Sequence, residues 1–365
     1  MSNRIERSTE ASVAISPEII KHSEEQVTLF FNLNDLKHPA VGKLYQLAVM
    51  KIARALADGI VINNFNPKAI EEYVPLAALT KQEDLEIPSL SRLLTDIIQL
   101  STFPAVYFRI VQVLKSKYSS SGQLADEVSQ DTNLAAQLLK VVNSPYYGFT
   151  SKVDSIKKAI TLLGTNEILT LALGLTIISQ FKDIPPELMD MRAFWKHSLT
   201  CGLFARQLAK ARRMDGQERF FVAGMLHDLG RLILFKKIPQ ACTRAMVMSF
   251  NAPASMSDAE KAVMGYDHAA VGGMLLKQWK IPDSLVDMVR FHHAPQNAQD
   301  PLAAGLMHLA DIMAIVLGIG DISMELVPTL NDDTWRLIGL SPEAVSLTVP
   351  LVQNQIDRTL EAFPV

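Results

Sequence analysis

The chain has few of the features that mark secreted, membrane-spanning or nucleic-acid-binding proteins. Its 365 residues include only two cysteines, Cys201 and Cys242, which excludes a disulfide framework and is typical of a reducing compartment. A net charge of −3 provides no basic field for nucleic acid or for an anionic membrane surface. Residues 1–13 contain no apolar segment of the kind found in signal peptides. We therefore expect a cytoplasmic protein that binds neither membranes nor nucleic acid directly.

Long apolar runs and the alternation typical of β-strands are also scarce. The most apolar run, residues 168–181, is too short to span a bilayer and is better explained as a core helix. Apolar residues elsewhere recur with helical spacing, and Gly or Pro residues separate one segment from the next. The pattern predicts an all-α, multi-helix fold, with helices that include residues 41–57, 194–212, 217–235, 268–279, 283–293 and 302–317.

The N-terminal part contains no catalytic motif. Residues 1–15 have the composition of a disordered segment, and Ser16-Pro17 then resembles a helix start, with a serine cap and a proline at the first helical position. The charged segment 81–88 ends in proline and is expected to link this region to the rest of the chain. We predict a small helical N-terminal region over residues 1–88, whose apolar residues either cover the main domain or support a homodimer.

Histidine is absent between His38 and His197, and an ordered set of histidines and aspartates then follows. Each member lies in or beside an apolar stretch that is predicted to be helical, where a bare ionisable group would cost several kcal/mol to bury. The set consists of His197, His227, Asp228, His268, His292, His293 and Asp311.

Helical spacing indicates which of these side chains point into the core. His197 shares one stripe with Phe194 and Cys201, and Asp311 shares one with His308. His292 and His293 differ in direction by roughly 100° on a helix, so both reach one site only if they straddle it. His268 opens a helix, and Gly230 either lets the chain turn or lets another segment approach closely.

The set suits divalent metal ions. One ion would take His197, His227, Asp228 and Asp311, and a second ion, bridged by Asp228, would take His268, His292 and His293. Such ligands suit Zn, Mn, Fe, Ni or Co, and we expect one or two ions, with Mg also considered. Two neighbouring ions can activate water against a phosphoester.

Simpler explanations exist for each residue taken singly. A histidine on an apolar face is usually a core residue with an ordinary hydrogen-bond partner, and Asp228 could pair with His197 or His227 or cap a helix. His292 and His293 could lie at a solvated helix end. Cys201, one turn from His197, could have a metal or redox role, although a small buried apolar side chain is more common. Metal binding is favoured for the set as a whole, because each acid and imidazole on an apolar stripe would otherwise need its own buried hydrogen-bond or ion-pair partner.

The order His197, His227-Asp228 and Asp311 resembles the ligand pattern of the HD superfamily of metal-dependent phosphohydrolases. Residues from about 92 to 300 resemble, more specifically, the HDOD domain, the HD-related output domain of bacterial signalling proteins. The resemblance rests on several matching pieces: Phe103-Pro104-Ala105-Val106, Asn143-Ser144-Pro145-Tyr146-Tyr147-Gly148, Ala223-Gly224-Met225-Leu226-His227-Asp228-Leu229-Gly230, Asp267-His268-Ala269-Ala270 and Arg290-Phe291-His292-His293.

The resemblance implies an all-helical regulatory module in residues 89–300, with an HD-like half from about residue 190 that residues 301–365 complete. The related HD-GYP domains hydrolyse cyclic di-GMP, and they resemble this chain at the paired histidines and at His268. The chain differs from them at Arg231, where they carry lysine, and at Ala294-Pro295, where they carry an acidic residue followed by the Gly-Tyr-Pro segment. Lysine and arginine are not interchangeable in phosphate sites, so cyclic-dinucleotide hydrolysis is not expected to carry over directly.

Two functional hypotheses follow. In the first, the chain is a signalling module, with or without metal, whose output is a contact with a signalling protein partner. In the second, it is a metal-dependent phosphohydrolase acting on a phosphorylated small molecule, a nucleotide or a cyclic dinucleotide, with Asp228 and Arg231 as its catalytic residues.

Overall fold

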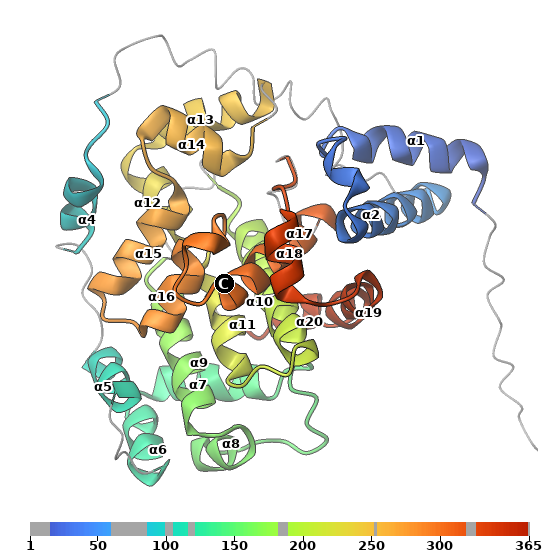
Figure 1. Cartoon of the computed structure of the whole chain (residues 1–365). Coiled ribbons are helices and arrows are strands. Elements are labelled where there is room, and N and C mark those ends of the chain that lie inside the picture. The colour runs from blue at the N-terminus through green and yellow to red at the C-terminus, as the bar shows by residue number, and fades with distance from the viewer. Residues whose placement is uncertain are drawn as a thin grey trace, which may run out of the picture.

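Helices form every regular element of the described part of the chain, so the all-α prediction is confirmed (Figure 1). The computed structural model describes residues 15–59, 86–98, 105–115, 121–181, 189–251, 254–318 and 326–363. Of the segments predicted as disorder (1–15) and as a linker (81–88), residues 1–14 and 81–85 lie outside these ranges. None of the described helices combines the length and the apolar composition that a membrane crossing requires.

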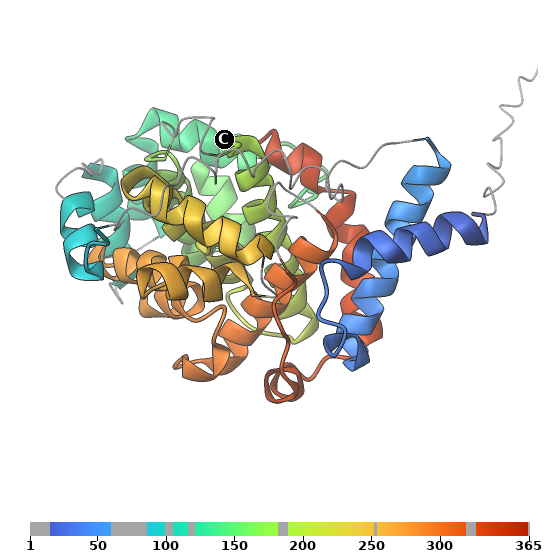
Figure 2. The same cartoon turned by 90° about the horizontal axis from the view of Figure 1, so that it is seen from above.

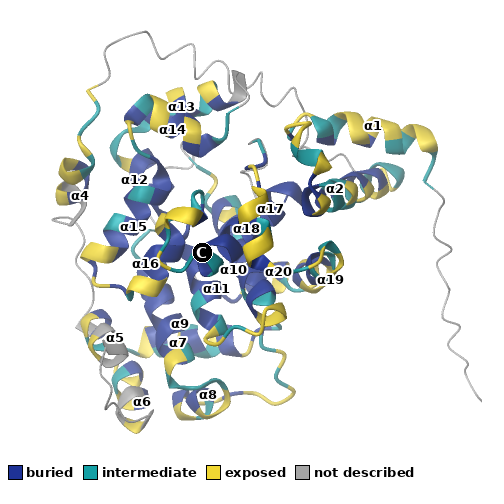
Figure 3. Ribbon diagram, in the orientation of Figure 1, coloured by how far each residue is buried: buried dark blue, intermediate teal, exposed yellow. Residues whose placement is uncertain are grey.

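Four central helices form the core around which the others pack. Helix α9 (Thr165–Ile178) is buried from Ile168 onward, as expected for a helix that is apolar on every face. Helix α10 (Met191–Ala211) packs along α11 (Gln217–Leu226) and against α17 (Pro301–Val316). Buried residues are concentrated on these helices (Figure 3). Polar groups on α10, α11 and α17 therefore face one another away from water.

The N-terminal helices lie at one side of the molecule, as seen from above in Figure 2. Helix α1 (Pro17–Thr28) begins after Ser16, whose hydroxyl accepts from the backbone N–H of Ile19, and the predicted cap is confirmed. The short helix η1 (Asp35–Lys37) leads into α2 (Pro39–Ala57), which packs against α17 and against α19 (Pro342–Gln353). The N-terminal helices therefore cover the main domain; whether they also support a dimer stays a prediction.

The other helices surround the core on the remaining sides. The first half of the chain contributes α4 (Leu90–Ile98), α5 (Ala105–Lys115), α6 (Ser121–Ser129), α7 (Thr132–Val142) and α8 (Ile156–Leu163). The second half adds α12 (Leu229–Lys237), α13 (Pro239–Asn251), α14 (Met256–Met264), α15 (His268–Gln278), α16 (Asp283–Arg290), η3 (Pro295–Asn297), α18 (Asp332–Ile338) and α20 (Ile356–Leu360).

A buried polar cluster joins the two halves at the start of α11. The hydroxyls of Tyr146 and Tyr147 donate to Glu218 Oε2 at 3.2 and 2.9 Å, and Arg206 Nε lies 2.9 Å from the other oxygen of Glu218. The guanidinium of Arg206 also lies over the ring of Tyr146. The Asn-Ser-Pro-Tyr-Tyr-Gly motif thus fixes the beginning of the helix that ends at His227.

Two predicted helix boundaries are wrong, and both errors fall at the histidines. Residues 217–235 were expected to form one helix, but α11 ends at Leu226, and His227 and Asp228 form a turn before α12. Residues 283–293 were also expected to be helical, but α16 ends at Arg290. Phe291, at the end of α16, has φ −116° and ψ 16°, outside the α region, so His292 and His293 lie in a turn.

Candidate metal centre

A close crossing of α10 and α11 brings the first group of polar side chains together. A Cβ atom added at Gly224 would lie 2.4 Å from the backbone of Gly202, and one added at Gly202 would lie 2.5 Å from the carbonyl oxygen of Phe221. Only glycine permits this backbone contact. It places His197, near the middle of α10, beside His227 at the end of α11.

His197, His227, Asp228 and Asp311 converge in the core. His197 Nε2 lies 3.2 Å from Asp311 Oδ1 and 3.8 Å from Asp228 Oδ2. His227 Nε2 lies 3.4 Å from Asp311 Oδ1, 3.5 Å from Asp228 Oδ2 and 3.3 Å from His197 Nε2. None of the four residues is more than 3% exposed. The predicted first group is therefore a set of neighbours in space.

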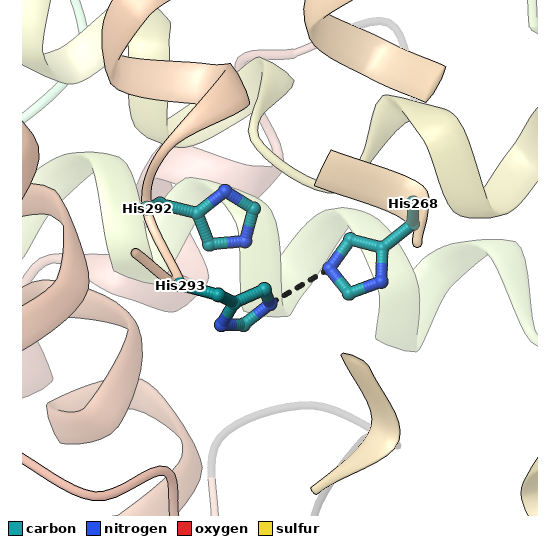
Figure 4. Close-up of side chains that lie close together, drawn as sticks. All are labelled: His268, His292 and His293. Carbon is teal, nitrogen blue, oxygen red and sulfur yellow. Dashed lines mark hydrogen bonds between the residues drawn. The ribbon is translucent and has the colours of Figure 1, made fainter. Parts of the chain in front are cut away.

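His268, His292 and His293 form a second group (Figure 4). His293 Nε2 lies 2.9 Å from His268 Nε2, and the rings of His292 and His293 are 4.0 Å apart. The turn after α16 lets both adjacent histidines face the same region, as the straddling arrangement requires. His268 is the first residue of α15, as predicted.

Asp228 lies between the two groups. Its Oδ2 atom faces His197 and His227, whereas its Oδ1 atom lies 3.1 Å from His268 Nε2. A Cβ atom added at Gly230 would lie 2.0 Å from the carbonyl oxygen of His268, so α12 and α15 approach through backbone contact. Of the two roles considered for Gly230, close approach is the one that the structure shows.

Three imidazole rings, those of His227, His292 and His268, are oriented by hydrogen bonds at Nδ1, the nitrogen that faces away from the other polar groups of the centre. The Nδ1 atom of His227 lies 2.7 Å from the carbonyl oxygen of Gly224, and Nδ1 of His292 lies 2.7 Å from that of Val289. An imidazole nitrogen that faces a carbonyl oxygen must carry the proton, so in the neutral form of each ring the Nε2 atom offers a lone pair to the interior. The same outer bond is typical of metal-ligating histidines.

Glu260 holds the third ring and was missed in the sequence. Its Oε2 atom accepts from Nδ1 of His268 at 2.6 Å and from the backbone N–H of the same residue at 2.8 Å. Glu260 is 2% exposed, on the α14 face that also buries Met256, Ala259 and Met264. An acid on that apolar stripe was the available signal, because a buried carboxylate needs a partner.

We expect Glu260→Gln to weaken metal binding while the fold is retained. The amide oxygen can still accept one of the two hydrogen bonds from His268, but the negative charge behind the ring is lost. Loss of an outer partner of this kind typically costs 10–100-fold in metal affinity. Titration with a competing chelator would measure the change, with Glu167→Gln, a substitution on α9, as control. Unchanged affinity would contradict the role assigned to Glu260.

Opposite charges compensate for burial of the aspartates. Burial alone would raise the pKa of Asp228, but Arg231, His227 and His268 hold it well below its usual value. Burial opposes ionisation of Asp311 as well, but hydrogen bonds from His197 and His227 keep its pKa well below the usual value. Both carboxylates are therefore ionised at neutral pH.

The histidines divide into two electrostatic classes. Burial would lower the pKa of His268, but Glu260 and Asp228 raise it to about 10. The pKa of His292 falls to about 3, because its ring is buried beside the cationic forms of His227 and His268. Nε2 of His292 has no hydrogen-bond partner among the described residues. A bare, buried lone pair facing other nitrogen and carboxylate atoms is the arrangement that a cation would satisfy.

The polar side chains form groups whose ligand atoms are close enough to hold a metal ion. Ligand atoms of His197, His227 and Asp228 lie within 4.8 Å of one another, and those of His268, His292 and His293 do so as well. Cys201 joins His227 and Asp311 in a third, overlapping group. Imidazole and carboxylate groups are ordinary ligands for Zn, Mn, Fe and Ni. The structure thus contains histidine–aspartate groupings that could bind metal.

A cavity of about 210 Å³ reaches the second group at His293. It is lined by His308 and by residues of α14, including Lys261, and on its other sides by Asn32 and residues 326–329. A hydrogen bond from Val327 N–H to the carbonyl oxygen of Phe30 ties these two covering segments together. Arg231 does not line this cavity; it is 6% exposed and lies 3.3 Å from Asp228 Oδ1.

A family comparison agrees with this architecture. The HDOD domain model matches residues 100–295, which is more than half of the chain. The chain belongs to the HDOD family. The match ends before Asp311, so the HDOD segment alone does not contain every residue of the centre.

Solved structures of three bacterial proteins have a similar fold. A Geobacter sulfurreducens HDOD domain protein of unknown function superposes with a TM-score of 0.60 at 22% identity, covering 76% of this chain and 98% of that one. A Shewanella amazonensis SB2B protein, whose name gives phosphohydrolase as a proposed activity, has a TM-score of 0.60 at 21% identity. The match covers 74% of this chain and 97% of that one. A Marinobacter aquaeolei VT8 protein, named for a proposed role in signal transduction, has a TM-score of 0.59 at 22% identity. The match covers 82% of this chain and 66% of that one.

Curated relatives extend well beyond the matched region. An uncharacterized protein of Treponema pallidum (strain Nichols) is 24% identical over 237 residues, which are 61% of this chain and 44% of the relative. The uncharacterized protein YuxH of Bacillus subtilis (strain 168) is 33% identical over 69 residues, 19% of this chain and 17% of the relative. The HDOD chain thus spans less than half the length of the curated relatives it matches.

Proposed function

We propose that the protein is a signal-transduction module in which a two-position metal centre holds the HD-like half together, and that its output is a contact with a protein partner. The burial of the centre carries the proposal. Six of its seven residues are at most 3% exposed, and only His293 reaches the cavity. Structural metal sites are typically closed in this way, whereas catalytic sites keep an open position.

In this proposal the protein residues have distinct tasks. His197, His227, Asp228 and Asp311 would hold one ion, and His268, His292 and His293 would hold the other. Asp228 would contribute one oxygen to each position, and Glu260 would orient His268. The ions would join α10, α11, α15 and α17 and would supply positive charge that compensates the buried carboxylates.

A second candidate function is phosphohydrolysis, favoured by the cavity that meets the centre at His293. A bound divalent ion would supply a polarised water for attack on a phosphoester. Lys261 lines this cavity and could contact an anionic substrate, although its ammonium group already lies 2.9 Å from Asp267 Oδ2. Arg231, packed against Asp228, is less well placed to contact a substrate.

Metal analysis and a substrate panel distinguish the two functions. Protein purified without chelator should contain one or two divalent ions per chain, and Asp228→Ala should lose them. We expect no turnover of phosphomonoesters, phosphodiesters or nucleotides with added Mn²⁺. Turnover that disappears in Asp228→Ala would overturn the regulatory proposal in favour of hydrolysis. A protein without bound metal, and with no affinity for added ions, would overturn the metal centre itself.

A further inference from the structure

Cys201 lies at the first position of the centre and has no role in the proposed function. It follows His197 by one helical turn on α10 and is completely buried. Its Sγ atom lies within 4.8 Å of the ligand atoms of His227 and Asp311, which come from α11 and α17. The thiol is therefore one of three ligand-type groups that three different helices bring together.

The position of Cys201 follows from the helix crossing that builds the centre. The Cβ atom of an alanine at 224 would lie 2.9 Å from the backbone carbon of Cys201 and 2.4 Å from Gly202. Residue 201 is therefore held against the last turn of α11, immediately before His227. No movement of α10 is needed to bring its sulfur to the first group.

We propose that Cys201 is a sulfur ligand at the first metal position, alongside His227 and Asp311. This inference rests on the proposed metal centre. On binding, the S–H bond breaks, the proton passes to solvent and a metal–sulfur bond forms, with no change in oxidation state. A thiolate favours Zn²⁺, Fe²⁺ or Co²⁺, whereas carboxylate and water ligands suit Mg²⁺ and Mn²⁺. Cys201 would thus select the ion at this position.

The simpler role for Cys201 is that of a small apolar side chain filling the space between α10 and α11. That role predicts no bond between sulfur and metal. Cys242 offers a matched comparison, because it is also buried, at 2% exposure, and belongs to α13 instead of the helices that build the first position.

Cobalt substitution tests the proposal by absorption spectroscopy. Co²⁺-loaded wild-type protein should show visible d–d bands and an intense near-ultraviolet band from thiolate-to-cobalt charge transfer. Cys201→Ala should lose the near-ultraviolet band, and Cys242→Ala should keep it. Cobalt bound with the same near-ultraviolet absorption in wild type and Cys201→Ala would overturn the sulfur ligand alone. Failure to bind cobalt would instead overturn the metal centre.

X-ray absorption of the Zn²⁺-loaded wild-type protein gives an answer that does not depend on how a variant folds. A sulfur ligand contributes a scattering shell at about 2.3 Å, distinct from nitrogen and oxygen ligands at about 2.0–2.2 Å. Bound zinc with only the shorter shell would overturn the role of Cys201 and leave the metal centre intact.

Discussion

Gly230→Ala should unfold at a markedly lower temperature than the wild type and should lose its metal. The added methyl group would lie 2.0 Å from the carbonyl oxygen of His268 and 2.9 Å from the backbone nitrogen of Gly272. Backbone atoms of two packed helices cannot move aside as a flexible side chain can, so α12 and α15 must separate. Asp228 and His268, which lie next to this contact, would then move apart.

The size of the effect follows from two opposing contributions. Overpacking costs about 1–3 kcal/mol and occasionally more, and contact with backbone places this site at the upper end. Alanine gains up to about 1 kcal/mol over glycine in a helix, which cannot offset that cost. Because the unfolding entropy of a 365-residue chain is large, we expect the melting temperature to fall by about 3–5 °C in a thermal scan.

Gly305→Ala is the matched control for this substitution. Gly305 also lies within a helix, α17, but the nearest atom to an added Cβ is the methyl carbon of Thr334 at 3.1 Å, which can shift. Its melting temperature should change little. Equal effects of the two substitutions, or an unchanged Gly230→Ala protein, would contradict the backbone contact between α12 and α15.

Protein freed of metal by a chelator should lose stability steeply as the pH falls below about 6.5. The pKa of His292 is lowered to about 3 by burial and by its cationic neighbours, and the pKa values of His293 and His308 are also lowered, chiefly by burial. A histidine whose pKa is lowered in the folded protein costs no stability while it is neutral in both the folded and the unfolded chain. Below its unfolded pKa of about 6.5, only the unfolded chain takes up the proton, so stability falls with pH.

The other titrating groups of the centre do not offset this slope. His227 and His268 have raised pKa values. Their contribution to folding stability has reached its full size at pH 6.5 and does not change as the pH falls further. Asp228 and Asp311 have lowered pKa values. They lose their contributions to folding stability only below about pH 4, the pKa of an aspartate in the unfolded chain. His292 and His293, which burial holds neutral, therefore give a slope of about 3 kcal/mol per pH unit between pH 6 and 5, and His308 adds to it.

Urea unfolding at several pH values would measure this slope. His308→Gln should reduce the slope but leave most of it, because His292 and His293 remain. The glutamine amide reaches the place of Nε2 and can still donate to the carbonyl oxygen of Thr329. A chelated protein with constant stability from pH 7 to 5 would show that these rings are not held neutral in the fold.

Local sequence features predicted much of the fold because their physics acts over a few residues. Ser16 caps α1 through a hydrogen bond from a backbone N–H three residues on, and this spacing is visible in the sequence. The apolar stripes that carry His197 and Asp311 follow from helical periodicity in the same way. The break at His227-Asp228 was missed because the preceding residues are apolar on every face and give no signal for a helix end.

The sequence by itself determined the all-helical class, the family and the seven polar residues that apolar helices would have to accommodate. Tertiary structure alone decided that Glu260 holds His268 and that Cys201 lies beside His227 and Asp311. The reason is that helical spacing determines only the direction in which a side chain leaves the axis of its own helix. Which groups then meet depends on how closely helices cross, and here glycines at 202, 224 and 230 set those distances.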